Sequence, residues 1–196
     1  MNNLNLQKFV LISVFIAIIV VLTFTPLGYL KIGLVSITFL SIPVAVGSIL
    51  TGKTGSIILG CVFGLTSFVQ CFGYDAFGTT LFSLDPLAMA VVCLLPRILA
   101  GFGAYLIFNA LSKKKNKLLP YVCATVGTSL INTVGFVGLM LLFFGKSDYI
   151  VNNLGSFWAI VKALVLINGL SEAAVCCIIG TALGKSLKTV IEKVRR

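Results

Sequence analysis

Two charged residues lie deep inside apolar stretches of this 196-residue chain. Arg97 stands near the middle of one apolar segment, and Glu172 stands in the second half of another. An ionised side chain at the centre of a bilayer costs about 2.5–3.5 kcal/mol on insertion scales, so such residues persist when they pair, line a wet cavity or bind a ligand. A guanidinium holds a carboxylate through two parallel hydrogen bonds, and Arg97 therefore suits an anionic ligand.

Amide and hydroxyl side chains stand at a similar depth, and helical spacing gathers them with the two charges. Asn132 and Asn168 are the amides. One shared helix face is predicted to hold Thr125, Thr128, Ser129 and Asn132, and a second to hold Trp158, Val161, Val165, Asn168 and Glu172. Three helices would then point polar groups at one level, as a small-molecule site requires. The alternative is structural: Arg97 and Glu172 pair with each other, and the asparagines bond to neighbouring backbone.

Residues nearer the outer mouth have two interpretations each. Lys162 either contacts the ligand or extends outward to water, and Trp158 is either a ligand contact or an interface anchor. The segment 73–85 is aromatic and contains glycines, so Tyr74 and Phe77 either close over the site as part of a lid or pack at the membrane interface.

The elements that must position these residues are membrane-spanning helices. Hydrophobic residues make up 59% of the chain and charged residues 10%, whereas soluble domains average roughly 45–50% and 25%. A span needs about 20 mostly apolar residues. The sequence predicts an all-α integral membrane protein, a single domain over residues 1–196, with six transmembrane helices in one bundle near 9–24, 34–50, 55–72, 86–111, 118–144 and 157–184.

Lysines and arginines predict the orientation of this bundle. With both termini in the cytoplasm, the inner ends hold eleven basic residues: Lys8, Lys53, Lys113, Lys114, Lys115, Lys117, Lys185, Lys188, Lys193, Arg195 and Arg196. The outer loops hold only Lys31 and Lys146. The positive-inside bias favours this topology. The net charge of +10 is then explained by topology and by attraction to anionic lipid heads, so no nucleic-acid partner is expected.

Several function classes are disfavoured. The chain has no histidine, the commonest zinc ligand and usual proton shuttle, and it shows no nucleophile–base constellation or acidic metal cluster. We therefore expect no enzyme activity, no cofactor and no metal site. The six cysteines are interpreted as small packing residues. Residues 47–54 match the P-loop pattern, but no strand and no soluble α/β domain surround them, and a tight cytoplasmic hairpin is the better interpretation.

Several stretches resemble the substrate-binding S components of energy-coupling factor (ECF) vitamin transporters, and the resemblance covers most of the chain. It is carried by the size, the six spans and three segments: 42–55 (IPVAVGSILTGKTG), 60–67 (GCVFGLTS) and 95–101 (LPRILAG). Pantothenate-type S components are the most similar subgroup. The resemblance implies a bacterial plasma-membrane protein that binds its vitamin near the outer face, through the later helices and outer loops.

The resemblance also implies partners. An S component docks on a transmembrane scaffold subunit carried by two ATPases and topples within the membrane, so ATP hydrolysis belongs to the partners. The family's small-xxx-small docking motif maps onto Ser13 and Ala17, with serine in place of the more usual alanine. Riboflavin, another vitamin or a nucleobase precursor stays open as substrate. Two other classes also remain: a self-sufficient secondary transporter, against which no inverted repeat is seen, and a structural or enzymatic membrane protein.

Overall fold

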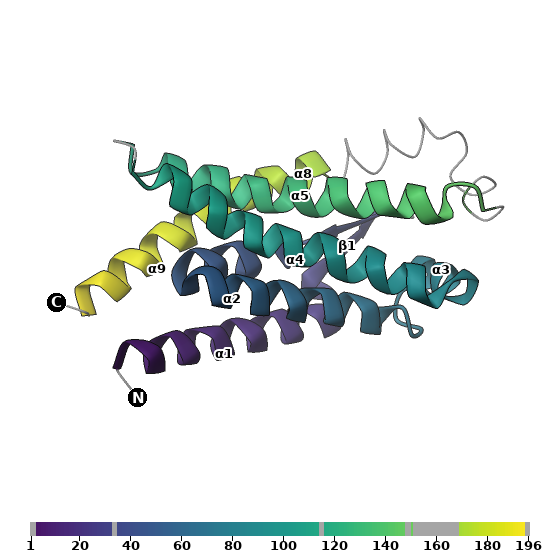
Figure 1. Ribbon diagram of the computed structural model, residues 1–196, viewed down its shortest axis with the longest axis horizontal. Coiled ribbons are helices and arrows are strands. Elements are labelled where there is room, and N and C mark those ends of the chain that lie inside the picture. The colour runs from purple at the N-terminus through teal and green to yellow at the C-terminus, as the bar shows by residue number, and fades with distance from the viewer. Residues whose placement is uncertain (1–2, 33–34, 114–115, 148–149, 151–168, 195–196) are drawn as a thin grey trace.

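Long antiparallel helices lie side by side in the computed structural model, which describes residues 3–32, 35–113, 116–147, 150 and 169–194 (Figure 1). Within those residues, five helices are long and apolar enough to cross a membrane. They lie in α1 (Asn3–Phe24), α2 (Ser41–Gln70), α4 (Pro86–Leu111), α5 (Leu119–Phe144) and the C-terminal helical stretch Leu170–Ile191. The protein is therefore a predominantly helical, multi-pass membrane protein.

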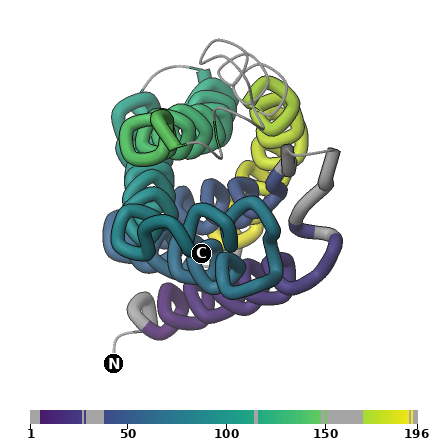
Figure 2. Tube along the Cα trace, turned by 90° about the vertical axis from the view of Figure 1, so that its right-hand side faces the viewer, coloured from purple at the N-terminus to yellow at the C-terminus, as the bar shows by residue number. Residues whose placement is uncertain are grey.

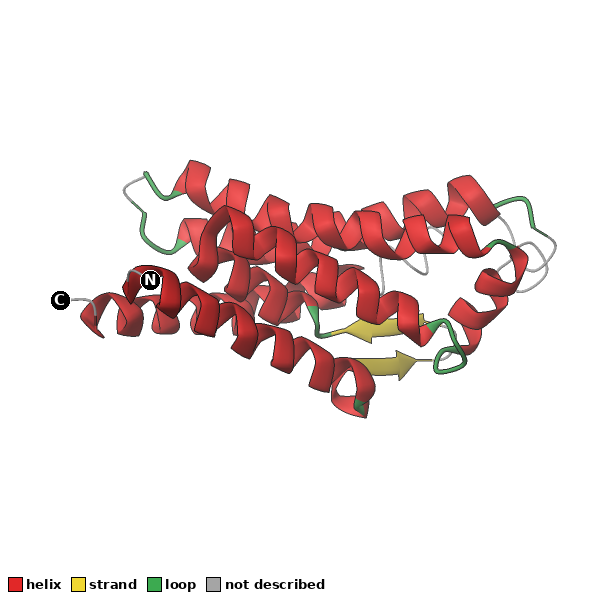
Figure 3. Cartoon of the chain, turned by 60° about the horizontal axis from the view of Figure 1, so that its bottom comes forward, coloured by secondary structure: helices red, strands yellow, loops and turns green. Residues whose placement is uncertain are grey.

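Two short strands interrupt the helical architecture after α1. A 3₁₀ turn, η1 (Pro26–Gly28), leads into β1 (Tyr29–Ile32), which pairs antiparallel with β2 (Val35–Thr38) in the register Tyr29↔Thr38. The backbone N–H of Phe39 donates to Gly28 O at 2.9 Å and closes the base of this hairpin. The strands lie beside the helices, in the half of the molecule away from the termini (Figure 3). Apart from this short hairpin, the regular structure of the described residues is helical, as the all-α class predicts.

The second predicted span, 34–50, is part strand and part helix. α2 is itself two helices joined at Gly52, whose φ of 78° and ψ of −163° are not helical. Leu59 contacts Gly47, whereas twelve residues of unbroken helix would put the two about 18 Å apart. The chain therefore turns back at Gly52. Lys53 begins the return helix, and residues 47–54, which match the P-loop pattern, lie in this helical hairpin.

The first half of α2, Ser41–Thr51, is buried at every position except Leu50, which is half-buried. A helix that is apolar all round belongs in a core, and this one packs against Phe15 and Ile19 of α1 and against Phe63 of the return helix. Eleven helical residues extend only about 16 Å, and β2 adds about 13 Å. Strand and half-helix together therefore cover about the thickness of one bilayer core.

α4 and α5 follow the predicted bounds closely, and α4 packs directly on α2. A Cβ on Gly60 would lie 2.8 Å from Arg97 O, and one on Gly64 would lie 2.9 Å from Leu94 Cα. Small residues at this spacing let the two backbones touch. Between α2 and α4, the short helix α3 (Ala76–Leu84) is capped by Asp75, whose Oδ2 accepts from Gly78 N at 2.8 Å.

The last helical stretch consists of α8 (Leu170–Val175), a π-helical turn η3 (Cys176–Gly180) and α9 (Thr181–Val194). It extends ten residues beyond the predicted end at 184. Viewed end on, α1 and α5 lie on opposite sides of the bundle with α2 and α4 between them (Figure 2). The start of α1 and the end of α9 lie at the same end of the molecule (Figure 1).

Candidate polar site between the helices

Glu172 and Ser41 lie far apart in the sequence and form a buried polar contact. Glu172 on α8 is 1% exposed, and Ser41, the first residue of α2, is fully buried. Ser41 Oγ donates a hydrogen bond to Glu172 Oε1. This contact depends on the strand β2, which brings the start of α2 into the interior, where the side chain of Ser41 reaches α8.

The polar face predicted for α5 is buried and borders Glu172. Thr125, Thr128, Ser129 and Asn132 are each at most 4% exposed. Ser129 and Asn132 lie close enough to act on the Glu172 carboxyl, and Thr125 Oγ1 lies 3.3 Å from Thr181 Oγ1 on α9. Among the described residues, Ser129 Oγ and Asn132 Oδ1 are buried and have no hydrogen-bond partner. Buried polar atoms are normally paired, so this face offers polar atoms that a ligand or water could pair.

Arg97 is held by the backbone carbonyl of Val92, which Pro96 leaves without its helical hydrogen bond. Pro96 has no N–H, so the carbonyl of Val92, four residues earlier in α4, lacks its helical partner. Arg97 Nη1 donates to this Val92 O at 2.8 Å. The guanidinium carbon also lies 4.7 Å from the ring centre of Phe136 and 5.7 Å from that of Phe63, within cation–π range.

The guanidinium keeps hydrogen-bonding capacity in this position. Arg97 Nε is buried and has no hydrogen-bond partner among the residues that the structure describes, and a guanidinium has five N–H donors in total. Arg97 and Glu172 form no ion pair with each other, although the charge of Arg97 acts on the Glu172 carboxyl. The geometry therefore differs from the direct pairing of Arg97 with Glu172 that the structural interpretation predicts, because each charge has its own contacts.

The helix α5 contacts both charged residues, so positions along it measure their separation. Asn132 lies beside Glu172, and Phe136, four residues later, lies on Arg97. Four helical residues rise about 6 Å. The arrangement offers a cation at one level and a carboxyl with hydroxyl and amide groups one turn away. It suits a small molecule with an anionic end and neutral polar groups a few bonds distant.

The other predicted site residues lie elsewhere or cannot be placed. Tyr74 is 67% exposed and stacks edge-on against Phe24, 5.9 Å between ring centres, so it joins the C-terminal ends of α1 and α2. Phe77 packs against the apolar cluster around Leu81 and Met140. Trp158, Lys162 and Asn168 lie outside the described residues.

The predicted docking pair lies on the surface of α1. Ser13 and Ala17 are both exposed, and Ser13 Oγ donates to Phe9 O of its own helix at 3.0 Å. A serine that bonds back to its own helix presents a small, largely apolar surface to its surroundings, so the small-xxx-small character is kept.

Sequence reasoning missed Ser41, Phe63 and Phe136 as neighbours of the two charges. Nothing in their local pattern distinguishes them from other serines and phenylalanines in apolar segments. Pro96 was a signal available in the sequence, because a proline inside a helix releases the carbonyl four residues before it, and the adjacent Arg97 can reach that carbonyl.

Two comparisons with known proteins bear on this site. A model of the family "ECF transporter, substrate-specific component" matches residues 7–183. The pantothenic acid transporter PanT of Lactococcus lactis subsp. cremoris (strain MG1363) is 29% identical over 161 residues, which cover 76% of this chain and 76% of PanT.

Proposed function

Since the chain belongs to the family of ECF transporter substrate-specific components, we propose that it captures pantothenate for uptake through the bacterial plasma membrane. A membrane-embedded binding component is not itself an enzyme. In this proposal the free energy for transport comes from a transmembrane scaffold subunit and two ATPase subunits, which the chain engages through the exposed Ser13–Ala17 face of α1.

The observation that carries the substrate assignment is the separate anchoring of Arg97 and Glu172. Pantothenate has a carboxylate at one end, an amide in its middle and two hydroxyls at the other end. Arg97 would hold the carboxylate, with Nε as one free donor. Glu172, Ser129 and Asn132 would accept from or donate to the amide and hydroxyls. Similarity to PanT supports the same substrate.

The proposed topology has six passages with both ends in the cytoplasm. The strand β2 and the first half of α2 make the second passage, and the segment that ends with α9 makes the sixth. The eleven basic residues predicted on the inner side support this orientation. It places the end of the molecule away from the termini, including α3, on the outer face, where the vitamin would enter.

The test is direct binding of pantothenate to the purified protein, compared with its alcohol analogue, in which a hydroxymethyl group replaces the carboxylate. Arg97→Lys removes the fork but keeps the charge. A charge-assisted hydrogen bond contributes about 1.5–3 kcal/mol, so we expect roughly 10- to 100-fold weaker pantothenate binding. The alcohol should bind both proteins equally weakly.

The exposed Lys117 provides a conservative control, since Lys117→Arg should leave binding unchanged. Mass spectrometry of small molecules released from the purified protein identifies a co-purified substrate without any prior choice of candidate. Another vitamin, such as riboflavin, would keep the family role and replace the substrate. Pantothenate binding that is unchanged in a folded Arg97→Lys protein would reject the contact between Arg97 and the carboxylate.

A further inference from the structure

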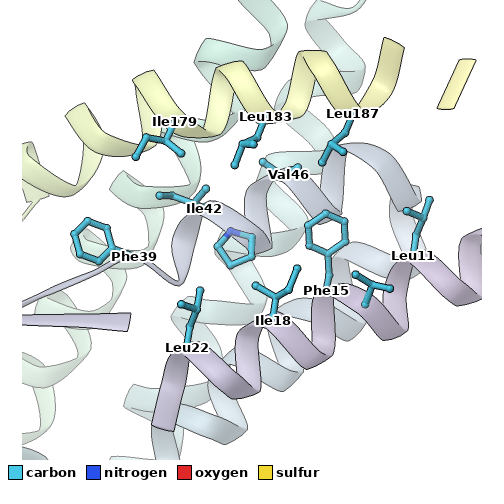
Figure 4. A pocket seen from close by; sticks show the side chains of 12 residues that line it. Leu11, Phe15, Ile18, Leu22, Phe39, Ile42, Val46, Ile179, Leu183 and Leu187 are labelled. Carbon is cyan, nitrogen blue, oxygen red and sulfur yellow. The ribbon is translucent and has the colours of Figure 1, made fainter. Parts of the chain in front are cut away.

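An apolar groove lies on the bundle apart from the polar site. It has a volume of about 550 Å³ and is formed by α1, Phe39 and the first half of α2, η3 and α9. Figure 4 shows side chains from these helices converging on it, with Leu11 and Leu187 at one end and Leu22 and Phe39 at the other. The residues that line it are Leu11, Val14, Phe15, Ile18, Leu22, Phe39, Ile42, Pro43, Val46, Ile179, Leu183 and Leu187. It contains no polar lining residue.

The length of the groove matches one leaflet of a bilayer. From Leu11 to Leu22, α1 rises about 16 Å, which is half of the hydrocarbon core of roughly 30 Å. The end at Leu11 and Leu187 points toward the start of α1 and the end of α9 (Figures 1 and 4). A single acyl chain of the leaflet on that side would therefore lie along the groove over its whole length.

Two cations stand at the same end. Lys8 precedes Leu11 by three residues on α1, so it lies close to the groove face, and it is exposed. Lys53 follows the Gly52 turn and is also exposed. This turn lies against α1 one turn from Lys8, because a Cβ on Gly55 would be 3.3 Å from Ile12 Cδ1.

We propose that this groove binds an anionic phospholipid, with one acyl chain between α1 and α9 and the phosphate near Lys8 and Lys53. The apolar lining accounts for binding of an acyl chain, since a surface without polar groups offers no hydrogen bonds to a polar ligand. The two lysines explain the headgroup, since each basic residue near an anionic lipid surface adds attraction. The site is independent of the vitamin and would be occupied in its absence.

The experiment is native mass spectrometry of the delipidated full chain titrated with dioleoylphosphatidylglycerol or with dioleoylphosphatidylcholine. We expect one tightly bound phosphatidylglycerol, roughly 30-fold tighter than phosphatidylcholine for two contributing lysines. Lys8→Gln with Lys53→Gln should remove this preference. Lys113→Gln with Lys117→Gln, which changes two exposed lysines of the α4–α5 connection, should keep it.

Filling the groove tests the acyl-chain half of the proposal. Val14→Trp with Leu183→Trp places bulk at two exposed lining positions and should abolish the tight site. Val21→Trp, on an exposed position of α1 that does not line the groove, should leave it intact. If the doubly filled variant unfolds, the lysine variants still decide the question.

Three results would overturn the proposal: undiminished phosphatidylglycerol binding in the folded groove-filled variant, equal affinity for the two lipids in the unaltered protein, or a preference that survives loss of Lys8 and Lys53. Groove-filled protein that keeps its lipid but fails to co-purify with partner subunits would identify the groove as a protein-docking surface instead.

Discussion

At the scale of single residues, the hydrogen bond from Ser41 to Glu172 can be tested against a neighbour with the same burial. Ser41→Ala leaves a buried carboxyl without this partner, which costs about 1–3 kcal/mol. Ser48 is equally buried in the same half-helix, but within the described part of the chain its Oγ has no hydrogen-bond partner. We therefore expect Ser41→Ala to lower the apparent melting temperature in detergent by several degrees and Ser48→Ala to leave it unchanged or raise it. Equal shifts would contradict the contact.

Pro96 gives a second residue-scale prediction. Pro96→Ala restores an N–H that competes with Arg97 for the Val92 carbonyl, so the guanidinium loses its fixed position. We expect a protein of equal or greater thermal stability that binds its ligand several-fold more weakly in equilibrium dialysis.

The matched change for this prediction is Pro86→Ala. Pro86 lies in the first turn of α4, where a missing N–H leaves no helical carbonyl unpaired. Binding that falls equally in both variants would show that Pro96 acts through something other than Arg97.

The polar residues of the candidate site were visible in the sequence, but their partners were not. Arg97, Glu172 and Asn132 are conspicuous because ionised and amide groups are rare in apolar segments. Ser41 lies 131 residues from Glu172 along the chain, and only the path of the strand β2 brings it there. Helical periodicity within one segment carries no information about such long-range contacts.

At the scale of elements, the contact between α2 and α4 depends on glycines. Gly60→Ala would place a Cβ 2.8 Å from Arg97 O and 2.9 Å from Ile98 Cα, and backbone atoms cannot rotate away as a side chain can. We expect the free energy of unfolding to fall by about 1–3 kcal/mol. The measurement is the temperature at which the buried cysteines react with a thiol-reactive dye, which should be lower in the variant.

Gly138 on α5 is the control for this prediction. A Cβ there would meet nothing within 4 Å, and alanine has a higher helix propensity than glycine by up to about 1 kcal/mol. Gly138→Ala should therefore leave the protein unchanged or make it more stable. Equal loss in both variants would mean that the glycines matter for helix formation in general rather than for the α2–α4 contact.

Sequence predicted some elements closely and others poorly, for a physical reason. α4 agrees with the predicted 86–111 and α5 nearly agrees with 118–144, because each is a continuous apolar run with polar ends. The segment 34–50 was predicted as helix because hydropathy records only apolar character. It does not distinguish a strand such as Val35–Thr38 from a helix. Backbone that is not helical is tolerated at membrane depth when protein surrounds it.

At the scale of the whole molecule, the proposed topology predicts where both termini lie. Fluorescent-protein fusions at either end of the full chain should fluoresce, because green fluorescent protein folds in the cytoplasm, and alkaline-phosphatase fusions at the same positions should be inactive. The reverse pattern at one end would require an odd number of passages, and at both ends an inverted molecule.

The turn at Gly52 has a consequence for how the chain enters the membrane. Residues 41–51 form a helix of only eleven residues, about half of what a bilayer-crossing helix needs, and the strand ahead of it would expose unpaired backbone groups to lipid. In the proposed topology this segment is the second passage, and it cannot be inserted on its own. It must wait until the return helix and the neighbours that enclose it have been synthesised, so we expect this passage to be established late in biogenesis.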